Sequence, residues 1–242
     1  MKHRGFVLSC VALGFVLSTS VAQAQTRGGM RQLPRQQDRS ARLYVLGGYA
    51  QVQLDEMNAR LASLPEPYSP VSEDLVLFGG GLHGRIDRWI LGVEVATLHS
   101  IEEGEMGDER TASLSGMTGT FGFGYSILQS RRFDFYPLVQ VGGTGATLLV
   151  EERDDPTWDE LLGDPGRTSS LSTILFHGAA GAGMDLTFDN GFFIGVRGTW
   201  SYTPPRDGWS DERGDVLGGP ELDMSGPSVR LMLGFGGSDA GR

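Results

Sequence analysis

The feature that most constrains this chain is an alternation of side chains that recurs in eight stretches. In each stretch, large apolar residues alternate with glycine, threonine, glutamine, histidine or arginine. Successive side chains of a strand point to opposite faces, so this pattern has the period of β structure. The stretches are 43–54, 75–86, 89–101, 115–128, 135–149, the two arms of a hairpin around 189–191, and 228–235. No segment shows a strong helical periodicity, and we therefore expect an all-β fold.

The hairpin around Asp189-Asn190-Gly191 raises a question of stability, because its arms are rich in glycine. Glycine weakens an ordinary strand, since it is costly to order and has no side chain to pack. A closed barrel answers this, because closure lets every backbone group pair and leaves no edge. In a narrow lumen the small residues also make room for long polar side chains. The glycine-rich face is thus predicted to point inward.

The connections between the stretches alternate in length. Short turns are predicted at 87–88, 129–132 and 189–191, and long loops at 55–73, 102–110, 151–169 and 203–225. Short periplasmic turns and long external loops are typical of outer-membrane barrels, whose tilted strands need about 9–11 residues to cross the bilayer. The sequence therefore predicts an eight-stranded antiparallel up-and-down transmembrane β-barrel, integral to the bacterial outer membrane.

The start of the chain indicates export. Residues 1–24 have a basic start, an apolar stretch and a small-x-small site at Ala22-Gln23-Ala24, so they are interpreted as a cleaved signal peptide. Residues 25–41 are interpreted as a flexible periplasmic leader, 42–236 as the barrel and 237–242 as a C-terminal tail. The single cysteine, Cys10, lies in the signal segment, so no disulfide is expected in the exported chain.

Two segments, FYPLVQVGGTG and GAAGAGMDLTFDNGFFIGVRG, resemble the strand–turn–strand sequences of small eight-stranded outer-membrane barrels, the OmpA-type transmembrane domain and its relatives. The resemblance covers about residues 42–236 and is one of pattern, without a single diagnostic motif. The sequence departs from it in two ways. We expect no peptidoglycan-binding domain of the kind that follows the barrel in OmpA itself, and Phe235 is followed by GGSDAGR, whereas such barrels usually end on an aromatic residue that the insertion machinery recognises.

The alternation assigns side chains to two faces. We expect an ion and hydrogen-bond network that plugs the lumen, formed by Arg85, Glu94, Asp185, Arg197, Arg230, Gln51, Gln140, His83 and His177. We expect membrane-interface aromatics on the outer face at Tyr44, Trp89, Tyr125, Phe135, Phe188, Phe192, Phe235 and Trp200. Val95 and Ile194 are predicted to contact lipid, and Thr120 to line the lumen.

The sequence predicts no catalytic residue, no metal site and no cofactor. Some outer-membrane barrels are lipid A deacylases with a lipid-facing His/Ser pair, but His99 and Ser100 are neighbours on one strand and point to opposite faces. His83 and His177 lack a metal-ligand spacing. The glycine pairs lie within strands, so they are not phosphate-binding loops.

The four long loops hold most of the acidic residues of a chain whose formal net charge is −10. This charge argues against nucleic acid as a partner. The expected partners are outer-membrane lipids and lipopolysaccharide, the barrel-insertion machinery, and divalent cations or a basic partner at the loops. A solvated acidic surface remains an alternative. The expected function is non-enzymatic, structural in the envelope or interactive at the surface; the alternatives are a lipid-modifying enzyme and a small-solute channel.

Overall fold

The computed structural model describes residues 39–65, 67–101, 110–130, 132–152, 168–211, 214–216 and 218–238. The predicted signal peptide, residues 25–38 of the predicted leader and the last residues of the predicted tail lie outside this range. Most of the predicted loops 102–110 and 151–169 also lies outside it.

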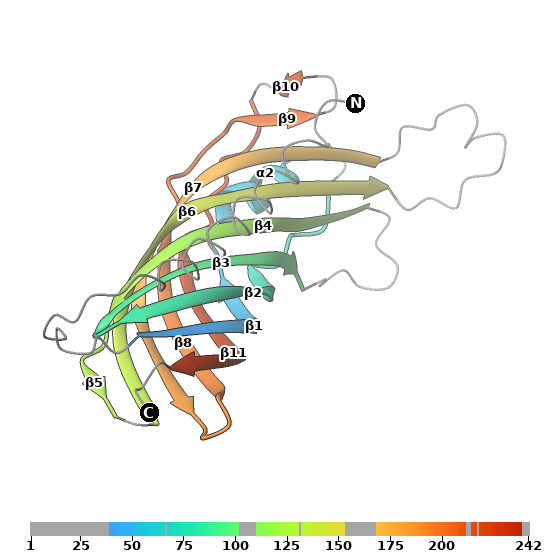
Figure 1. Cartoon of the computed structure of the whole chain (residues 1–242). Helices are drawn as coiled ribbons and strands as arrows, with labels where there is room; N and C mark the ends of the chain where they lie inside the picture. The colour runs from blue at the N-terminus through green and yellow to red at the C-terminus, as the bar shows by residue number, and fades with distance from the viewer. Residues whose placement is uncertain are drawn as a thin grey trace, which may run out of the picture. The chain divides into compact units, whose positions relative to one another are not determined.

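The described chain is almost entirely strand. Its elements are β1 (Arg39–Gln51), α2 (Asp55–Ala62), β2 (Asp74–Ile86), β3 (Trp89–Ser100), β4 (Arg110–Tyr125), β5 (Leu128–Gln129), β6 (Phe133–Glu152), β7 (Thr168–Thr187), β8 (Phe192–Tyr202), β9 (Trp209–Asp211), β10 (Gly214–Val216) and β11 (Gly226–Ser238). Each of the long strands pairs antiparallel with the next along the chain, as Figure 1 shows. The first strand, β1, pairs with β2 on one side and with β11 on the other, which closes the sheet. The prediction of an eight-stranded antiparallel up-and-down barrel is confirmed.

Two ends of the barrel can be distinguished by their connections. At the short-turn end, Asp87-Arg88, residues 126–132 and Asp189-Asn190-Gly191 join neighbouring strands. The last of these turns closes with hydrogen bonds from the Phe188 amide to the Phe192 carbonyl at 2.8 Å and from the Gly191 amide to the Phe188 carbonyl at 3.0 Å. Gly191 has φ +81°, which favours glycine. The tight turn was thus recognisable from its residue types.

At the loop end, the strands differ in length. Strands β6 and β7 have 20 residues each and β4 has 16, whereas β8 has 11. Strand β8 pairs with residues 178–187 of β7. Residues 168–177 of β7 lie beyond the end of β8 and continue to pair with β6. The three long strands therefore project past the others at this end, to the right in Figure 1.

A short helix replaces part of the predicted loop 55–73. Helix α2 begins after Leu54 and buries Met57 and Leu61. Leu54, Met57 and Leu61 recur at helical spacing, but only over two turns, so the sequence carried too little periodicity to predict the helix. Within the described ranges, no helix has the length and the apolar character needed to cross a membrane.

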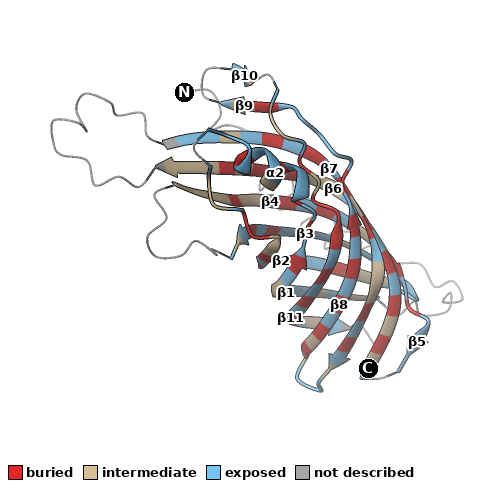
Figure 2. Ribbon diagram, turned by 180° about the vertical axis from the view of Figure 1, so that it is seen from behind, coloured by how far each residue is buried: buried red, intermediate tan, exposed pale blue. Residues whose placement is uncertain are grey.

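Burial alternates along the strands, as the banded colouring of Figure 2 shows. Inward residues are buried, and outward residues are large, apolar and exposed; Leu43 and Phe78, for example, are both 69% exposed. In β1 the phase is opposite to the one that the sequence suggested. Tyr44 is 4% exposed and points inward, whereas Gln51 is exposed on the outside. The predicted interface role of Tyr44 and the predicted lumen position of Gln51 are therefore wrong.

The physical reason for this reversal lies in the composition of β1. Both faces of 43–54 carry apolar residues and a glycine, so the alternation does not distinguish them. The pairing register decides instead. Leu43 lies opposite Leu82 of β2 and Phe235 of β11, which are both outward residues, and this places the odd positions of β1 outside.

Candidate functional site

The interior of the barrel holds a buried network of seven charged side chains, which we call the charged plug: Arg42, Arg85, Glu94, Asp134, Asp185, Arg197 and Arg230. Their side chains are between 1% and 14% exposed. They come from β1, β2, β3, β6, β7, β8 and β11. The plug therefore connects strands across the lumen, and not only neighbours in the sheet.

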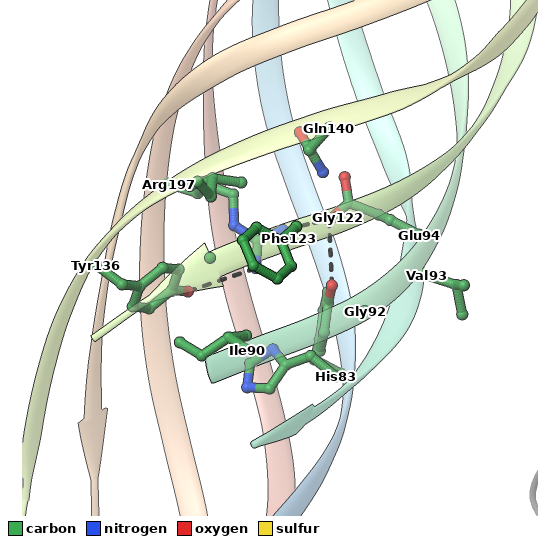
Figure 3. A pocket seen from close by; sticks show the side chains of 13 residues that line it. His83, Ile90, Gly92, Val93, Glu94, Gly122, Phe123, Tyr136, Gln140 and Arg197 are labelled. Atoms are coloured by element: carbon green, nitrogen blue, oxygen red, sulfur yellow. Dashed lines mark hydrogen bonds and ion pairs between the residues drawn. The ribbon is translucent and has the colours of Figure 1, made fainter. Parts of the chain in front are cut away.

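One centre of the charged plug is Glu94 on β3. Its two carboxylate oxygens accept hydrogen bonds from Arg197 at 2.7 Å and from Arg230. The hydroxyl of Tyr44 donates to the same carboxylate at 3.2 Å. Figure 3 shows Glu94 and Arg197 in the packed interior. A carboxylate shared by two arginines satisfies the buried charge with oriented hydrogen bonds, which is what makes such a charge tolerable away from water.

The second centre is a pair of aspartates nearer the short-turn end. Arg42 donates to Asp185 at 2.5 Å and to Asp134 at 3.2 Å. Arg85 donates to both oxygens of Asp134, at 2.9 and 2.8 Å. Arg42 thus links two carboxylates that would otherwise repel each other in a low-dielectric interior.

Tyr136 joins the two centres. Its hydroxyl donates to Asp185 at 3.2 Å and accepts from Arg197 at 3.4 Å. The connection runs from Glu94 through Arg197 and Tyr136 to Asp185, so the whole plug forms one bonded network. The void beside it measures only about 20 Å³ and is lined by Tyr44, Glu94 and Tyr136 among others (Figure 3). That volume holds about one water molecule, so the plug fills the lumen at this level.

The other predicted lumen residues lie inside as well, except Gln51. Gln140 donates to Thr120 at 3.4 Å and accepts from Arg230 at 3.4 Å. His83 and His177 are buried, at 3% and 6% exposure. His83 Nδ1 and His177 Nε2 have no hydrogen-bond partner among the described residues. His83 Nε2 lies 3.8 Å from Asp185 of the plug, and the His83 ring packs against Tyr44 with ring centroids 5.6 Å apart.

Four members of the interior network were missed from the sequence. Asp134 and Tyr136 have the same parity as Gln140 on β6, so the alternation could have placed them. Arg42 and Tyr44 were missed because the phase of β1 was assigned the wrong way round. Within the network, Asp185 pairs with Arg42, and Arg197 pairs with Glu94.

The loop-end half of the lumen is apolar, which the sequence did not predict. We call this cluster the apolar cap. Its buried members are Ala50, Val52, Leu54, Met57, Leu61, Val71, Leu75, Leu77, Leu98, Leu114, Ala146, Leu148, Leu175, Trp209, Leu222 and Met224. Side chains of α2 and of residues 203–225 contribute to it, together with inward residues of the long strands.

Trp209 shows how the long loop takes part in the apolar cap. This side chain lies in the segment that the sequence predicted to be a long loop, but it is 1% exposed. Its indole nitrogen donates to the Pro220 carbonyl at 2.7 Å, which satisfies the polar atom of a buried tryptophan. Trp158, the other loop tryptophan, lies outside the described residues. Segment 203–225 therefore folds inward over the lumen and is partly core.

The outer surface carries the other predicted aromatics. Trp89, Tyr125, Phe188, Phe235 and Trp200 are exposed, and Phe135 and Phe192 are half-buried. Near the short-turn end they contact one another: the rings of Trp89 and Tyr125 lie 4.8 Å apart, and those of Phe192 and Phe235 lie 5.3 Å apart. Val95 is also outward, at 53% exposure, whereas Thr120 is inward, at 7%.

Two kinds of site that the sequence argued against are a metal site at the histidines and a His99/Ser100 pair. No group of three or more histidine, cysteine, aspartate or glutamate side chains in the described part of the chain is placed to hold a metal ion. His99 is exposed on the outer face, while the Ser100 hydroxyl accepts a hydrogen bond from the Leu114 amide at 3.1 Å. The two side chains do not form a pair.

No protein-family model matches this sequence, and no curated protein matches it significantly. Several solved structures are similar in fold. Ail, the attachment invasion locus protein of Yersinia pestis, is 13% identical with a TM-score of 0.46, over 82% of this chain and 98% of that chain. Neisserial surface protein A is 8% identical with a TM-score of 0.40, over 82% and 95%. The outer membrane protein OprG from Pseudomonas aeruginosa is 14% identical with a TM-score of 0.40, over 84% and 95%. At these identities the likeness concerns the fold alone.

Proposed function

We propose that this chain is an integral outer-membrane barrel without enzymatic activity, with a lumen closed to ions and with acidic loops presented outside the cell. The observation that carries the proposal is the outward band of exposed apolar residues. It includes residues from all eight long strands: Leu43, Phe78, Val95, Phe121, Val141, Phe176, Trp200 and Leu231, each between 48% and 69% exposed. An apolar band that runs round a closed barrel is unfavourable in water and favourable in hydrocarbon.

The polar interior supports the same reading. A soluble lipocalin-like barrel has its apolar face inside and its polar face outside. Here Glu94, Asp185 and Arg230 are inside, at 4%, 1% and 2% exposure, beneath an exposed apolar surface. The aromatic contacts near the short-turn end fit one of the two girdles that lie at membrane interfaces. The short-turn end is then periplasmic, and the loop end faces outward.

The first test is where the full-length protein fractionates. We expect it in the outer-membrane fraction, resistant to carbonate extraction, with heat-modifiable migration on a gel. Recovery of a monodisperse protein from the soluble fraction would overturn the proposal.

The second test is orientation. Single cysteines can be introduced at Ser63, which is exposed after α2, and at Asn190, which is exposed in the β7–β8 turn. A membrane-impermeant maleimide on intact cells should label the Ser63 variant alone, and both variants should be labelled after lysis. Labelling of Asn190 alone on intact cells would invert the topology.

The third test concerns the lumen. The charged plug and the apolar cap lie at different levels of the same channel, and either one blocks a continuous water column. Planar-bilayer recordings of the purified protein should therefore show no stable open channel. A stable, large conductance would favour the small-solute channel instead. Release of acyl chains from lipopolysaccharide by the purified protein would favour the lipid-modifying enzyme.

The loops have the proposed role of surface contact. The loops hold most of the acidic residues of the chain. This charge favours contact with divalent cations that bridge to lipopolysaccharide phosphates, or with a basic partner. Phe235, on the outer face of the last strand, is the proposed signal for the insertion machinery. A Phe235→Ala variant that reaches the outer membrane in normal amounts would remove this part of the proposal.

A further inference from the structure

A second, larger cavity lies at the short-turn end of the barrel, on the other side of the charged plug from the apolar cap. It measures about 690 Å³. Four arginines line it, namely Arg39, Arg42, Arg85 and Arg88, together with two carboxylates, Asp134 and Asp189. The cavity therefore has more cationic than anionic groups in its wall.

The two carboxylates of the wall are already engaged. Asp134 accepts hydrogen bonds from both Arg42 and Arg85. Asp189 pairs with Arg132 at 2.8 Å, at an exposed turn where both side chains are 64% exposed. Neither carboxylate is left to neutralise a further cation in the cavity.

The charged plug as a whole has the same imbalance. It contains four arginines but only three carboxylates, and none of the seven side chains is more than 14% exposed. A charge that is removed from water without a partner is unfavourable by several kcal/mol, so a buried excess of positive charge calls for a counter-anion. The short-turn end of the network opens onto the cavity described above.

Unused donors point to where the anion would lie. The Nε of Arg85 and the hydroxyl of Ser40 are buried and have no hydrogen-bond partner within the described part of the chain. Both residues line the cavity. Arg88 lines it as well, from the exposed β2–β3 turn, and forms no ion pair among the described residues. Arg85, Arg88 and Ser40 thus line the same cavity.

We propose that this cavity binds an oxyanion of the phosphate type, held by Arg85 and Arg88 with Ser40 as a further donor. The planar guanidinium presents several N–H donors in a fork that matches phosphate oxygens, and such charge-assisted bonds are among the stronger ones. The cavity is larger than one phosphate group. It accommodates either free phosphate or the phosphate of a lipid headgroup, which share the chemistry that the site recognises.

The experiment uses the full-length protein, purified in a non-ionic detergent and titrated with inorganic phosphate at constant ionic strength set by potassium chloride. Binding is measured by calorimetry and by the temperature of unfolding. We expect saturable binding and a rise in that temperature. Arg88→Gln should raise the dissociation constant for phosphate about tenfold, because one hydrogen-bonded charge pair is lost. Arg85→Gln should do the same or more.

The matched control is Arg60→Gln, which removes an exposed arginine of α2, outside the cavity wall. It should bind phosphate as the wild type does. Arg88 is exposed and forms no ion pair with another described residue, so its variant should fold even where Arg85→Gln does not, and heat-modifiable migration checks this. Absence of saturable binding above the chloride control, or equal weakening by Arg88→Gln and Arg60→Gln, would overturn the proposal.

A second titration separates the two sources of phosphate. A short-chain phosphatidylglycerol, kept below its micelle-forming concentration, is compared with inorganic phosphate. Tighter binding of the lipid that is still lost in Arg88→Gln assigns the site to a headgroup. Equal or weaker binding of the lipid assigns it to free phosphate. Tighter lipid binding that is unchanged in Arg88→Gln places the lipid on the outer surface and counts against the cavity.

Discussion

The short-turn half and the loop-end half of the lumen are filled by opposite chemistry. The charged plug consists of residues on the strands themselves, such as Glu94 on β3 and Arg197 on β8. The apolar cap brings together strand residues with side chains from α2 and from segment 203–225, such as Leu61 and Trp209. One half is closed by ion pairs across the barrel, and the other by a small hydrophobic core.

The difference follows from what surrounds each half in the proposed orientation. At the level of the plug the outside is hydrocarbon, so burying an apolar side chain in the lumen gains little over leaving it in lipid. Ion pairs are strong there because the dielectric constant is low. The cap lies toward the loops and includes side chains of α2 and of segment 203–225, which would otherwise be exposed to water. There the hydrophobic effect can drive loops inward.

The largest expected effect is on the plug. Glu94→Ala leaves Arg197 and Arg230 buried without their shared carboxylate, which should lower the free energy of unfolding by about 3–5 kcal/mol. Urea titration of the protein in detergent or lipid measures this. In planar bilayers the same variant should still show no stable channel, because the apolar cap also blocks the lumen. The control is Asp189→Ala, which breaks an exposed pair and should change stability little. Equal stabilities of the two variants would mean that the plug contributes nothing as a unit.

The outer surfaces of the two halves should also respond differently. Val95 is outward on β3, next to Glu94 of the plug, whereas Gln51 is outward at the loop end of β1. Arginine at Val95 should lower the free energy of unfolding in a bilayer by about 2–4 kcal/mol, and arginine at Gln51 by about 0–1 kcal/mol, because the penalty falls toward the interface. A larger loss at Gln51 would place the bilayer at the level of the cap.

A smaller and more local effect is expected in the cap. Leu61→Ala removes a buried side chain of α2 and should destabilise the cap by about 2–3 kcal/mol. Because α2 lies outside the strand ladder, we expect faster protease cleavage around α2, with the urea midpoint of the barrel nearly unchanged. An equal shift of both readouts would show that plug and cap unfold together.

The smallest expected effect compares the two faces of the wall. A Cβ at Gly142, on the inner face, would overlap the carbonyl oxygen of Gly119, whereas a Cβ at Gly119, on the outer face, would meet nothing within 4 Å. Gly142→Ala should cost about 1–3 kcal/mol through strain, and Gly119→Ala should be nearly neutral. Refolding yield and urea midpoints of the two variants provide the measurement. A neutral Gly142→Ala would show that the inner wall can relax at the level of the plug.

The sequence by itself determined the number of strands, their antiparallel order and the short turns. Period-two alternation and turn residues such as Asp189-Asn190-Gly191 are local signals, and the hydrogen-bond ladder requires only local information to form. Where the two faces of a stretch differ strongly in polarity, the sequence also determined which face turns into the lumen. Glu94, Arg197 and Arg230, for example, all lie inside.

Only the tertiary structure decided the rest. In β1 both faces are apolar, so the register with β2 and β11 fixed which one turned inward, and Tyr44 and Gln51 exchanged places. The partners of the charges were decided by closure of the ring, because Arg230 and Glu94 are 136 residues apart in the chain. The inward folding of Trp209 depended on a hydrophobic space that exists only once the strands around it have closed. Pairing across a lumen is a property of the closed barrel and of no single segment, and for this reason the alternation could indicate the wall but not what fills it.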